Sequence, residues 1–373
     1  DRVAIWAPNI SEWIVAAIGV HSAGGVVVPL NTRMKGSEAA YVLNASGARM
    51  LFTVKGFLDI DYPAMLGGES VPELREIVVM RGDSDGLTSW QAFLDRANAI
   101  DVAVAEVRAA SVGADDTMDI MFTSGTTGKP KGVITAHGQN IQSFTVWSGT
   151  VGLNSTDNYL IINPFFHSFG YKAGWLAAII RGAKILPVLT FDLDRVLQQI
   201  QDDKVSMLPG PPTIYQSILA HPRRAEYDLS SLRLAVTGAA AVPVELVERM
   251  RNDLQFETVV TAYGLTETCG VVTICRAEDD AETISHTSGR AMPGVELRCI
   301  NSTGQEVPVG EAGEILVRGF NVMRGYFNNP SATAEAIDSD GWLHTGDVGV
   351  LDEHGYIRIT DRLKDMIISG GFN

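Results

Sequence analysis

A ten-residue segment rich in glycine, hydroxyl and lysine side chains carries the strongest chemical signal in the sequence. It reads Thr123-Ser-Gly-Thr-Thr-Gly-Lys-Pro-Lys-Gly132 and follows an apolar run, Met118–Phe122, that predicts a strand. Backbone N–H groups converge in such a loop, and Lys129 and Lys131 add positive charge, so the segment is suited to holding phosphate groups. It is not a Walker A loop, because Thr123 replaces the first glycine of that motif and a proline follows the lysine.

Five further segments carry side chains suited to binding a nucleotide or an acid. They are Asn163-Pro-Phe-Phe-His-Ser-Phe-Gly170, Gly238-Ala-Ala240, Tyr263-Gly-Leu-Thr-Glu-Thr268, Gly341-Trp-Leu-His-Thr-Gly-Asp347 and Asp361-Arg-Leu-Lys-Asp365. Tyr263 offers a flat face to a base, although a Tyr after an apolar strand more often fills a core. Asp347 is suited to accept ribose hydroxyls, or is a turn residue. Arg362 suits a ribose or phosphate contact, or a surface ion pair.

In their order and over essentially the whole chain, these six segments resemble the ANL superfamily of acyl-CoA synthetases, non-ribosomal adenylation domains and beetle luciferases. The resemblance implies that a carboxylate attacks the α-phosphate of ATP to give an acyl-adenylate and pyrophosphate, and that the acyl group then passes to coenzyme A. The expected cofactors are therefore ATP, Mg²⁺ and coenzyme A, and the expected partner is a small carboxylic acid.

The resemblance also implies a role for each matching residue. The residues that hold the β- and γ-phosphates are Thr123, Ser124, Gly125, Thr126, Thr127, Gly128 and Lys129. Those that contact adenine and ribose are Gly238, Ala239, Ala240, Tyr263, Asp347 and Arg362. Thr266 meets the α-phosphate, and Glu267 binds Mg²⁺, a cation that takes carboxylate and phosphate oxygens.

His167 lies in an apolar aromatic run, where a lone histidine is more often a core residue than a catalyst. In the family this position lies beside the acyl carboxylate, so we favour positioning of the carboxylate or gating over general-base catalysis. Amino-acid-activating relatives have an aspartate here, and the histidine therefore predicts a substrate without an α-amino group.

Lys364 resembles the hinge on which the family's small carboxy-terminal domain rotates between two half-reactions. The sequence continues for nine residues after this hinge, so we expect the small domain, with its adenylation lysine, to be absent from this chain. A non-turnover module that binds the adenylate is accordingly one alternative function. An enzyme that loads a carrier protein instead of coenzyme A is another.

The stretches 165–173, 208–217 and 229–237 resemble actinobacterial ligases that activate a ring-containing propanoate from sterol breakdown. A medium- or long-chain fatty acid is the alternative substrate. Lys172 is suited to a polar group on a ring substrate, but we expect it to be a surface lysine whose stem packs on apolar neighbours.

Alternating strand and helix patterns fill the first 270 residues or so. The predicted strands are Val3–Trp6, Val26–Leu30, Met50–Val54, Met118–Phe122, Tyr159–Asn163, Ala183–Leu189, Val205–Leu208, Leu232–Thr237 and Thr258–Ala262. The predicted helices are Ser11–Ser22 with Ser11 as N-cap, Ser37–Asn44, Tyr171–Arg181, Asp192–Asp203, Thr213–Ala220 and Pro243–Leu254. After about Asp279, short strands at Val295–Ile300, Gly313–Val317, Val348–Leu351 and Tyr356–Ile359 are separated by turns.

This pattern predicts an α/β fold with two layered subdomains on mainly parallel sheets and a small antiparallel β-barrel. The expected boundaries are 1–155 with the phosphate loop, 156–280 with the adenine and acyl site, 281–360 for the barrel and 361–373 for the hinge.

Composition narrows the class of protein. Of 373 residues, 29 are Lys or Arg and 44 are Asp or Glu, which gives a net charge of −15 and argues against a nucleic-acid partner. No stretch is long and apolar enough to predict a membrane span, and no signal peptide is visible. Three cysteines at irregular spacing predict reduced thiols in a cytoplasmic protein, and a homodimer is a further assembly that we consider.

Overall fold

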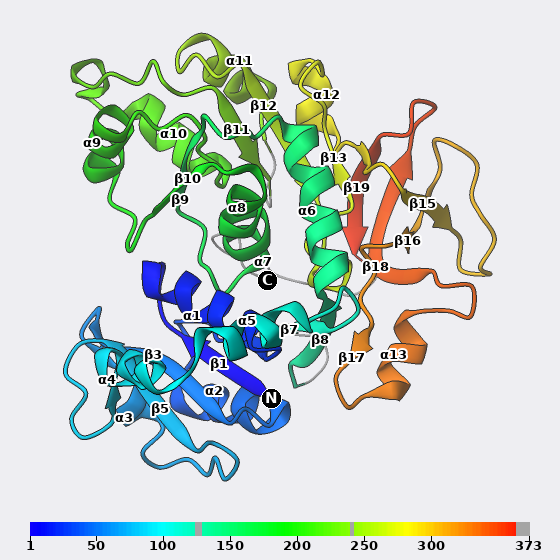
Figure 1. Cartoon of the computed structure of the whole chain (residues 1–373). Helices are drawn as coiled ribbons and strands as arrows, with labels where there is room; N and C mark the ends of the chain where they lie inside the picture. The colour runs from blue at the N-terminus through cyan, green and yellow to red at the C-terminus, as the bar shows by residue number, and fades with distance from the viewer. Residues whose placement is uncertain (124–128, 239–241, 363–373) are drawn as a thin grey trace. The chain divides into compact units, whose positions relative to one another are not determined.

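A computed structural model describes residues 1–123, 129–238 and 242–362 (Figure 1). Contacts divide the chain into two compact units. The first unit comprises Asp1–Gly138, Pro164–His167 and Met323–Pro330, and the second comprises Gln139–Asn163, Ser168–Val322 and Ser331–Asn373. Within the described ranges, none of the helices has the length and apolar character needed to cross a membrane.

The first unit is built on a large mixed sheet in the order β17-β8-β7-β2-β1-β3-β5-β6. The bounds are β1 Arg2–Trp6, β2 Val26–Pro29, β3 Met50–Phe57, β4 Ile60–Asp61, β5 Glu76–Arg81, β6 Thr88–Ser89, β7 Thr117–Thr123, β8 Lys131–Ala136 and β17 Gly325–Tyr326. The pairs of β1 with β2 and β3 are parallel, as expected, whereas β7 with β8 and β8 with β17 are antiparallel. The loop between β7 and β8 is too short for a parallel crossover, so these strands pair as a hairpin.

The helices of the first unit include the two that the sequence predicts, α1 and α2, and further short ones that it does not predict. They are α1 Ser11–Ser22, α2 Gly36–Ser46, α3 Tyr62–Met65, α4 Trp90–Asp95, the 3₁₀ turn η1 Arg96–Ala99 and α5 Val102–Ala110. The bounds of α1 are confirmed, but Ser11 is not its N-cap. Ile10 takes that position with an extended backbone, and the Ser11 hydroxyl instead donates to Glu12 Oε2 at 3.0 Å.

The second unit contains a parallel sheet formed by β10 (Lys184–Pro187), β9 (Asn158–Ile161), β11 (Leu234–Thr237) and β12 (Thr258–Tyr263). The predicted strand Val205–Leu208 is only partly confirmed. Met207 alone bridges Tyr159 on one side and Leu234 on the other, so it joins β9 to β11. Two short strands, β13 (Thr273–Ile274) and β14 (Arg290–Ala291), extend the sheet from β12 with antiparallel pairing. The helices in this part are α6 His137–Val151, α9 Leu193–Asp203, α10 Pro212–Ala220, η3 Arg224–Glu226, α11 Val244–Asn252 and α12 Ala281–His286.

The single helix predicted over Tyr171–Arg181 is instead two pieces, a π-helical segment η2 (Tyr171–Leu176) and α8 (Ala177–Arg181), and the short helix α7 (Ser168–Gly170) precedes them. The path kinks at Gly174, whose φ and ψ are −84° and −107°. A Cβ at Gly174 would lie 3.2 Å from Phe169 O and 3.3 Å from Ile161 Cγ2, so the bend is tightly packed at this glycine.

The carboxy-terminal strands are antiparallel, as predicted, but the described residues form an open sheet rather than a barrel. The order is β15-β16-β18-β19, with bounds Val295–Ile300, Ala312–Gly319, Leu343–Leu351 and Ile357–Arg362, and α13 (Pro330–Ala336) lies between β16 and β18 in the chain. Ile300, Leu316 and Trp342 form its buried cluster. Four strands are too few to close around a core of side chains.

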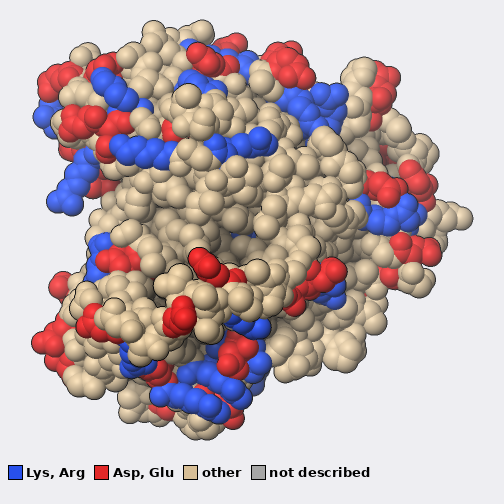
Figure 2. Space-filling model, in the orientation of Figure 1, with Lys and Arg blue, Asp and Glu red and all other residues tan. Residues whose placement is uncertain are grey.

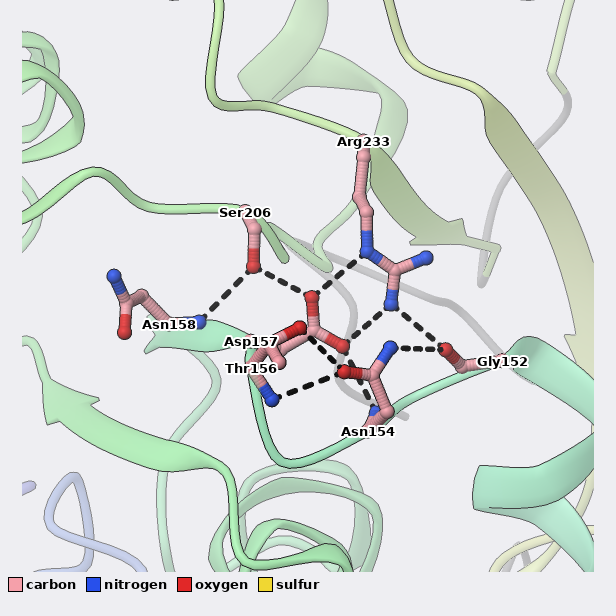
Figure 3. A network of polar contacts seen from close by, with 7 residues as sticks. All are labelled: Gly152, Asn154, Thr156, Asp157, Asn158, Ser206 and Arg233. Atoms are coloured by element: carbon pink, nitrogen blue, oxygen red, sulfur yellow. Dashed lines mark hydrogen bonds and ion pairs between the residues drawn. The ribbon is translucent and has the colours of Figure 1, made fainter.

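A buried polar network joins the amino ends of the parallel strands in the second unit (Figure 3). Asp157, immediately before β9, accepts hydrogen bonds from Arg233 Nε (2.8 Å), Ser206 Oγ (2.7 Å) and the Asn154 backbone N–H (2.9 Å). Burial raises the pKa of Asp157, but these hydrogen bonds and the Arg233 charge outweigh it and hold the pKa below its usual value. The Asp157 carboxylate is therefore stabilised in its charged form, and the network fixes this edge of the sheet.

The exposed surface mixes both signs of charge. Basic and acidic side chains are interspersed on the face drawn in Figure 2. Ion pairs near the surface include Arg81–Glu12 and Arg96–Glu76. Cys269, Cys275 and Cys299 form no disulfide with one another. All three are buried, which the sequence did not predict.

Candidate active site

The predicted phosphate loop is the connection between β7 and β8, and both of its ends are anchored. Thr123 pairs in register with Lys131, and the Tyr41 hydroxyl donates to Pro130 O at 2.9 Å. Lys129 is exposed, with Nζ 5.6 Å from the centre of the Tyr41 ring. The predicted residues Ser124, Gly125, Thr126, Thr127 and Gly128 lie outside the described residues.

Lys131 lies at the base of the same hairpin. Its Nζ is 4.7 Å from the centre of the Tyr326 ring. Each of the two lysines that bracket Pro130 thus rests on an aromatic face, which favours a cation and restricts where the ammonium groups lie. The first unit therefore holds two positive charges at the mouth of the predicted phosphate loop.

In the second unit, three residues predicted for the nucleotide meet in one cluster. Tyr263 ends β12, Asp347 lies in β18, and Arg362 ends β19 directly opposite Asp347 in the register. The Tyr263 hydroxyl donates to Asp347 Oδ2 at 2.6 Å, and Arg362 pairs through Nε with Asp347 Oδ1. The Asp347 side chain is only 1% exposed, against 26% for Arg362. The carboxylate is therefore buried, and the guanidinium is partly exposed to solvent.

Electrostatics fix the roles inside this cluster. Burial raises the pKa of Asp347, while the Tyr263 hydrogen bond and the Arg362 charge oppose that shift. Burial and the neighbouring carboxylate raise the pKa of Tyr263 well above its usual value, so its hydroxyl stays a donor. A carboxylate accepts about four hydrogen bonds, and Asp347 therefore retains capacity to accept the hydroxyls of a ligand.

A tight turn directly after Tyr263 carries Thr266 and Glu267, both half-buried, on the 3₁₀ turn η4 (Thr266–Thr268). Thr268 closes this turn, because its hydroxyl oxygen accepts the Leu265 backbone N–H at 3.0 Å. The turn requires a glycine at position 264, because a Cβ there would lie 2.5 Å from Val271 Cα and closer still to the Gly270 carbonyl oxygen. The Glu267 carboxylate is thus placed on a rigid turn next to the tyrosine.

Glu267 would suit a magnesium ion that takes most of its other ligands from phosphate groups and water. Among the described residues, no cluster of three or more His, Cys, Asp or Glu side chains is arranged to hold a metal by itself. Magnesium in nucleotide sites commonly takes one or two carboxylates and completes its shell with phosphate oxygens and water. One carboxylate on a fixed turn meets that requirement.

The carboxyl ends of β11 and β12 lie side by side near this cluster. Gly238 follows β11 with φ of +155°, and a Cβ there would lie 3.3 Å from Ala262 O, so a side chain is disfavoured. Ala239 and Ala240 lie outside the described residues. Thr237 was not among the predicted site residues; the residue is 1% exposed, and its hydroxyl has no hydrogen-bond partner within the described ranges. Its place as the last strand residue before the predicted adenine segment was the available signal.

His167 belongs to the first unit, in the short segment Pro164–His167. The segment is anchored to α1 and its preceding loop, because the Phe165 backbone N–H donates to Asn9 Oδ1 at 2.8 Å and the Phe165 ring meets Trp13 edge-on at 5.8 Å. Burial lowers the pKa of His167, so the imidazole is neutral at pH 7. A neutral imidazole is suited to hydrogen bonding and not to carrying charge.

Lys172 differs from the prediction. It is not a surface lysine, because the side chain is fully buried, at 0% exposure, within the π-helical segment. All residues from Tyr171 to Ala178 are buried, so this stretch has no solvent-exposed face. The predicted hinge residue Lys364 lies outside the described residues.

Comparison with known proteins gives one family and close relatives. The family model described as "AMP-binding enzyme" matches residues 1–327. A curated protein of Rhodococcus jostii (strain RHA1), named 3-[(3aS,4S,7aS)-7a-methyl-1,5-dioxo-octahydro-1H-inden-4-yl]propanoyl:CoA ligase, is 52% identical over all of this chain and 72% of its own length. A protein of the same name from Mycobacterium tuberculosis is 51% identical over all of this chain and 71% of its own length.

Solved structures support the same relationship. The crystal structure of an anthranilate CoA ligase in complex with anthranoyl-AMP superposes with a TM-score of 0.85 at 27% identity, over all of this chain and 69% of that protein. The α/β architecture with its antiparallel carboxy-terminal sheet is therefore shared with a ligase that holds an acyl-adenylate.

Proposed function

Because the chain belongs to the family of AMP-binding enzymes, and within it is an acid–CoA ligase, we propose that it activates a bicyclic ring propanoate with ATP and transfers the acyl group to coenzyme A. The acid that we propose is the 1,5-dioxo-octahydroindenyl propanoate named for the two curated relatives. Identity of about one residue in two over the whole chain supports extending their substrate to this protein.

The observation that carries the adenylation step is the cluster of Tyr263, Asp347 and Arg362. A buried carboxylate, fixed by two donors and retaining acceptor capacity, is suited to the two hydroxyls of a ribose. In this proposal Asp347 and Arg362 hold the ribose. Tyr263 lies against adenine together with Gly238, Ala239 and Ala240.

For the other predicted site residues, we propose the roles that the resemblance to the family implies. The loop from Thr123 to Lys129 holds the β- and γ-phosphates, and Thr266 meets the α-phosphate where the acid attacks. Glu267 binds Mg²⁺, which reduces the repulsion between the carboxylate and the triphosphate when it is bound. His167 orients the acid carboxylate as a neutral hydrogen-bonding group, and Lys364 acts as the hinge between the two half-reactions.

The acid-binding wall that we propose is the segment from Ser168 to Ala178. Gly170, Ala173 and Gly174 are small, and Tyr171 and Trp175 stack at 4.9 Å between ring centres. Small residues beside a rigid aromatic pair suit a bulky hydrocarbon ring better than a thin chain. A straight-chain fatty acid is the competing substrate.

The test is a substrate panel with the full-length protein, followed by release of AMP. We expect the dioxo-indenyl propanoate to give the largest kcat/KM, octanoate a smaller one, and free amino acids no turnover. Thioester is expected with coenzyme A and not with a phosphopantetheinyl carrier protein. Preference for octanoate would replace the proposed acid, and thioester on the carrier alone would replace the proposed acceptor.

A further inference from the structure

The pairing of Asp347 with Arg362 depends on two irregular places in the carboxy-terminal sheet of the second unit. The two residues face each other across β18 and β19. Each lies at or next to a point where the pairing of neighbouring strands shifts register. Such β-bulges occur next to active sites, where they re-aim a side chain that a regular strand would direct elsewhere. The groups that hold these bulges in shape therefore also position the ribose-binding residues.

The first irregularity lies between β16 and β18. Leu316 pairs with His344. Two residues back along β16, Glu314 pairs with Val348. A single residue of β16 thus faces three residues of β18, 345–347, which we call the β18 bulge. Its last residue is the ribose-binding aspartate, so the conformation of the bulge sets the direction of that carboxylate.

The Glu314 side chain holds the β18 bulge from the neighbouring strand. Its Oε1 accepts the Gly346 backbone N–H at 3.3 Å, and its Oε2 lies 3.2 Å from His344 Nδ1. Gly346 has φ of +72°, a left-handed conformation in which regular strand pairing cannot continue. The half-buried carboxylate therefore replaces a ladder contact and joins the residue before the bulge to the centre of the bulge.

The second irregularity lies between β18 and β19. From Gly349 to Asp347, β18 advances by two residues. Over the same distance β19 advances by three residues, from Ile359 to Arg362. A regular ladder would place Asp361 opposite Asp347, so that two carboxylates would face each other. The arginine thus meets the aspartate in one register alone, and the placement of Asp347 along β18 decides whether the pair forms.

We infer that Glu314 is a positioning residue for ribose recognition, which acts through the β18 bulge on Asp347. The inference rests on the proposed function, in which Asp347 accepts the ribose hydroxyls, and it adds a residue that does not itself contact the nucleotide. By accepting the Gly346 N–H, Glu314 fixes the backbone one residue before Asp347 and hence the direction of that carboxylate. A purely structural role for Glu314 predicts no dependence on the ribose hydroxyls.

The experiment measures the Kd of ATP and of 2′,3′-dideoxyATP, which lacks both ribose hydroxyls, by calorimetric titration of the full-length protein. Glu314→Met keeps the length of the side chain and removes both acceptor oxygens. Glu314→Gln keeps an oxygen for the Gly346 N–H and offers an NH₂ to His344. Glu296→Met is the matched control, because Glu296 forms an ion pair with Arg318 across β15 and β16 of the same sheet. Thermal unfolding is measured for each variant.

We expect Glu314→Met to raise the Kd of ATP about 3- to 10-fold, which corresponds to about one hydrogen bond to the ribose. The Kd of the dideoxy analogue should change by less than about twofold, because that ligand makes no such bond. Glu314→Gln should restore most of the discrimination between the two nucleotides, and Glu296→Met should leave it unchanged. If Glu314→Met does not fold, Gly346→Ala distorts the same bulge and should show the same loss of discrimination.

Two results overturn the inference alone. ATP binding by Glu314→Met with the wild-type Kd would mean that the β18 bulge keeps its shape without the carboxylate. Equal weakening of both nucleotides would mean that Glu314 has only a structural role. A wild-type protein that binds ATP and the dideoxy analogue equally well would instead overturn the proposed ribose contact, and the inference with it. The wild-type titrations thus separate the two failures.

Discussion

Two buried aspartates in the second unit are a matched pair for separating scaffold from site. Asp157 and Asp347 have side chains only 1% exposed, and each pairs with one arginine. Asp157 precedes β9 at the amino edge of the parallel sheet, whereas the Asp347 cluster includes Tyr263 at the carboxyl end of β12. The same substitution to asparagine is expected to have opposite consequences at the two positions.

Asp157→Asn should reduce stability by about 3 kcal/mol. The carboxylate accepts from Ser206, Asn154 and two nitrogens of Arg233, and an asparagine keeps one oxygen while it turns an NH₂ toward the remaining donors. Unpaired buried donors cost about 1–3 kcal/mol each, and the arginine loses its counter-charge. Because the network lies at the amino edge of the sheet, ATP affinity should stay within twofold of wild type.

Asp347→Asn should cost less than about 1 kcal/mol of stability. The amide oxygen still accepts from Arg362, and the Tyr263 hydroxyl can rotate to accept from the new NH₂. The raised pKa of Asp347 indicates that the charged carboxylate is itself unfavourable in this position. Loss of charge-assisted bonds to the ribose, worth about 2 kcal/mol, should raise the Kd for ATP about 30-fold.

The assay pairs urea denaturation, followed by tryptophan fluorescence, with calorimetric titration of ATP for wild type and both variants in full-length protein. The reasoning requires a crossed result: stability lost in one variant and affinity lost in the other. Unchanged ATP affinity in Asp347→Asn would refute the ribose contact. Equal weakening of ATP binding in both variants would show that the two positions are coupled and that Asp157 is not a valid control.

Three further outcomes follow from the same geometry. Gly264→Ala should destabilise the protein by about 2 kcal/mol or more, because the new Cβ would clash with backbone atoms. Gly19→Ala, in a helix with open space around the new Cβ, should stabilise the protein by about 0.5–1 kcal/mol. Urea denaturation of both variants measures the two changes. Glu267→Gln should slow adenylation, measured by pyrophosphate release, at least about 100-fold and change its dependence on magnesium, with little change in ATP affinity. An unchanged magnesium dependence would contradict the assignment of Glu267 as a magnesium ligand. The two aspartates should also titrate with opposite signs. The folded-state pKa of Asp157 is lowered, so its contribution to stability is present above the unfolded pKa of about 3.9 and is lost as the pH falls. The folded-state pKa of Asp347 is raised, so its contribution to stability declines as the pH rises from the unfolded pKa of about 3.9. Curves of stability against pH for the two asparagine variants should each lose one of these slopes.

Local patterns predicted much of the fold. The α1 bounds and the β15 bounds agree with the periodicity and turn residues of the sequence, because both elements depend mainly on local composition. The β7–β8 hairpin and the single bridging residue Met207 depend on which strands pair with each segment in the folded chain. Such pairing is set by tertiary structure and has no local signal.

Site residues divide in the same way. Tyr263 and Asp347 are 84 residues apart in the chain, and their convergence followed from the resemblance to a family and not from spacing. The burial of Lys172 contradicts the usual behaviour of its residue type, which is why sequence reasoning placed it on the surface. Local rules fail most often where function demands an unfavourable arrangement, so this error itself marks a position of interest.

The contrast between the two edges of the parallel sheet extends that argument beyond single residues. At the amino edge, Asp157 has its acceptors filled by protein donors, and the lowered pKa records a favourable, closed network. At the carboxyl edge, Asp347 has a raised pKa and Thr237 has a buried hydroxyl with no partner within the described ranges. The two aspartates are equally buried but differ in how completely their hydrogen-bonding capacity is used. This difference distinguishes scaffold from site, because groups that bind a ligand must keep part of that capacity unused until the ligand arrives. Saturating ATP should therefore lower the pKa of Asp347 by supplying hydroxyl donors, while leaving the Asp157 network unchanged.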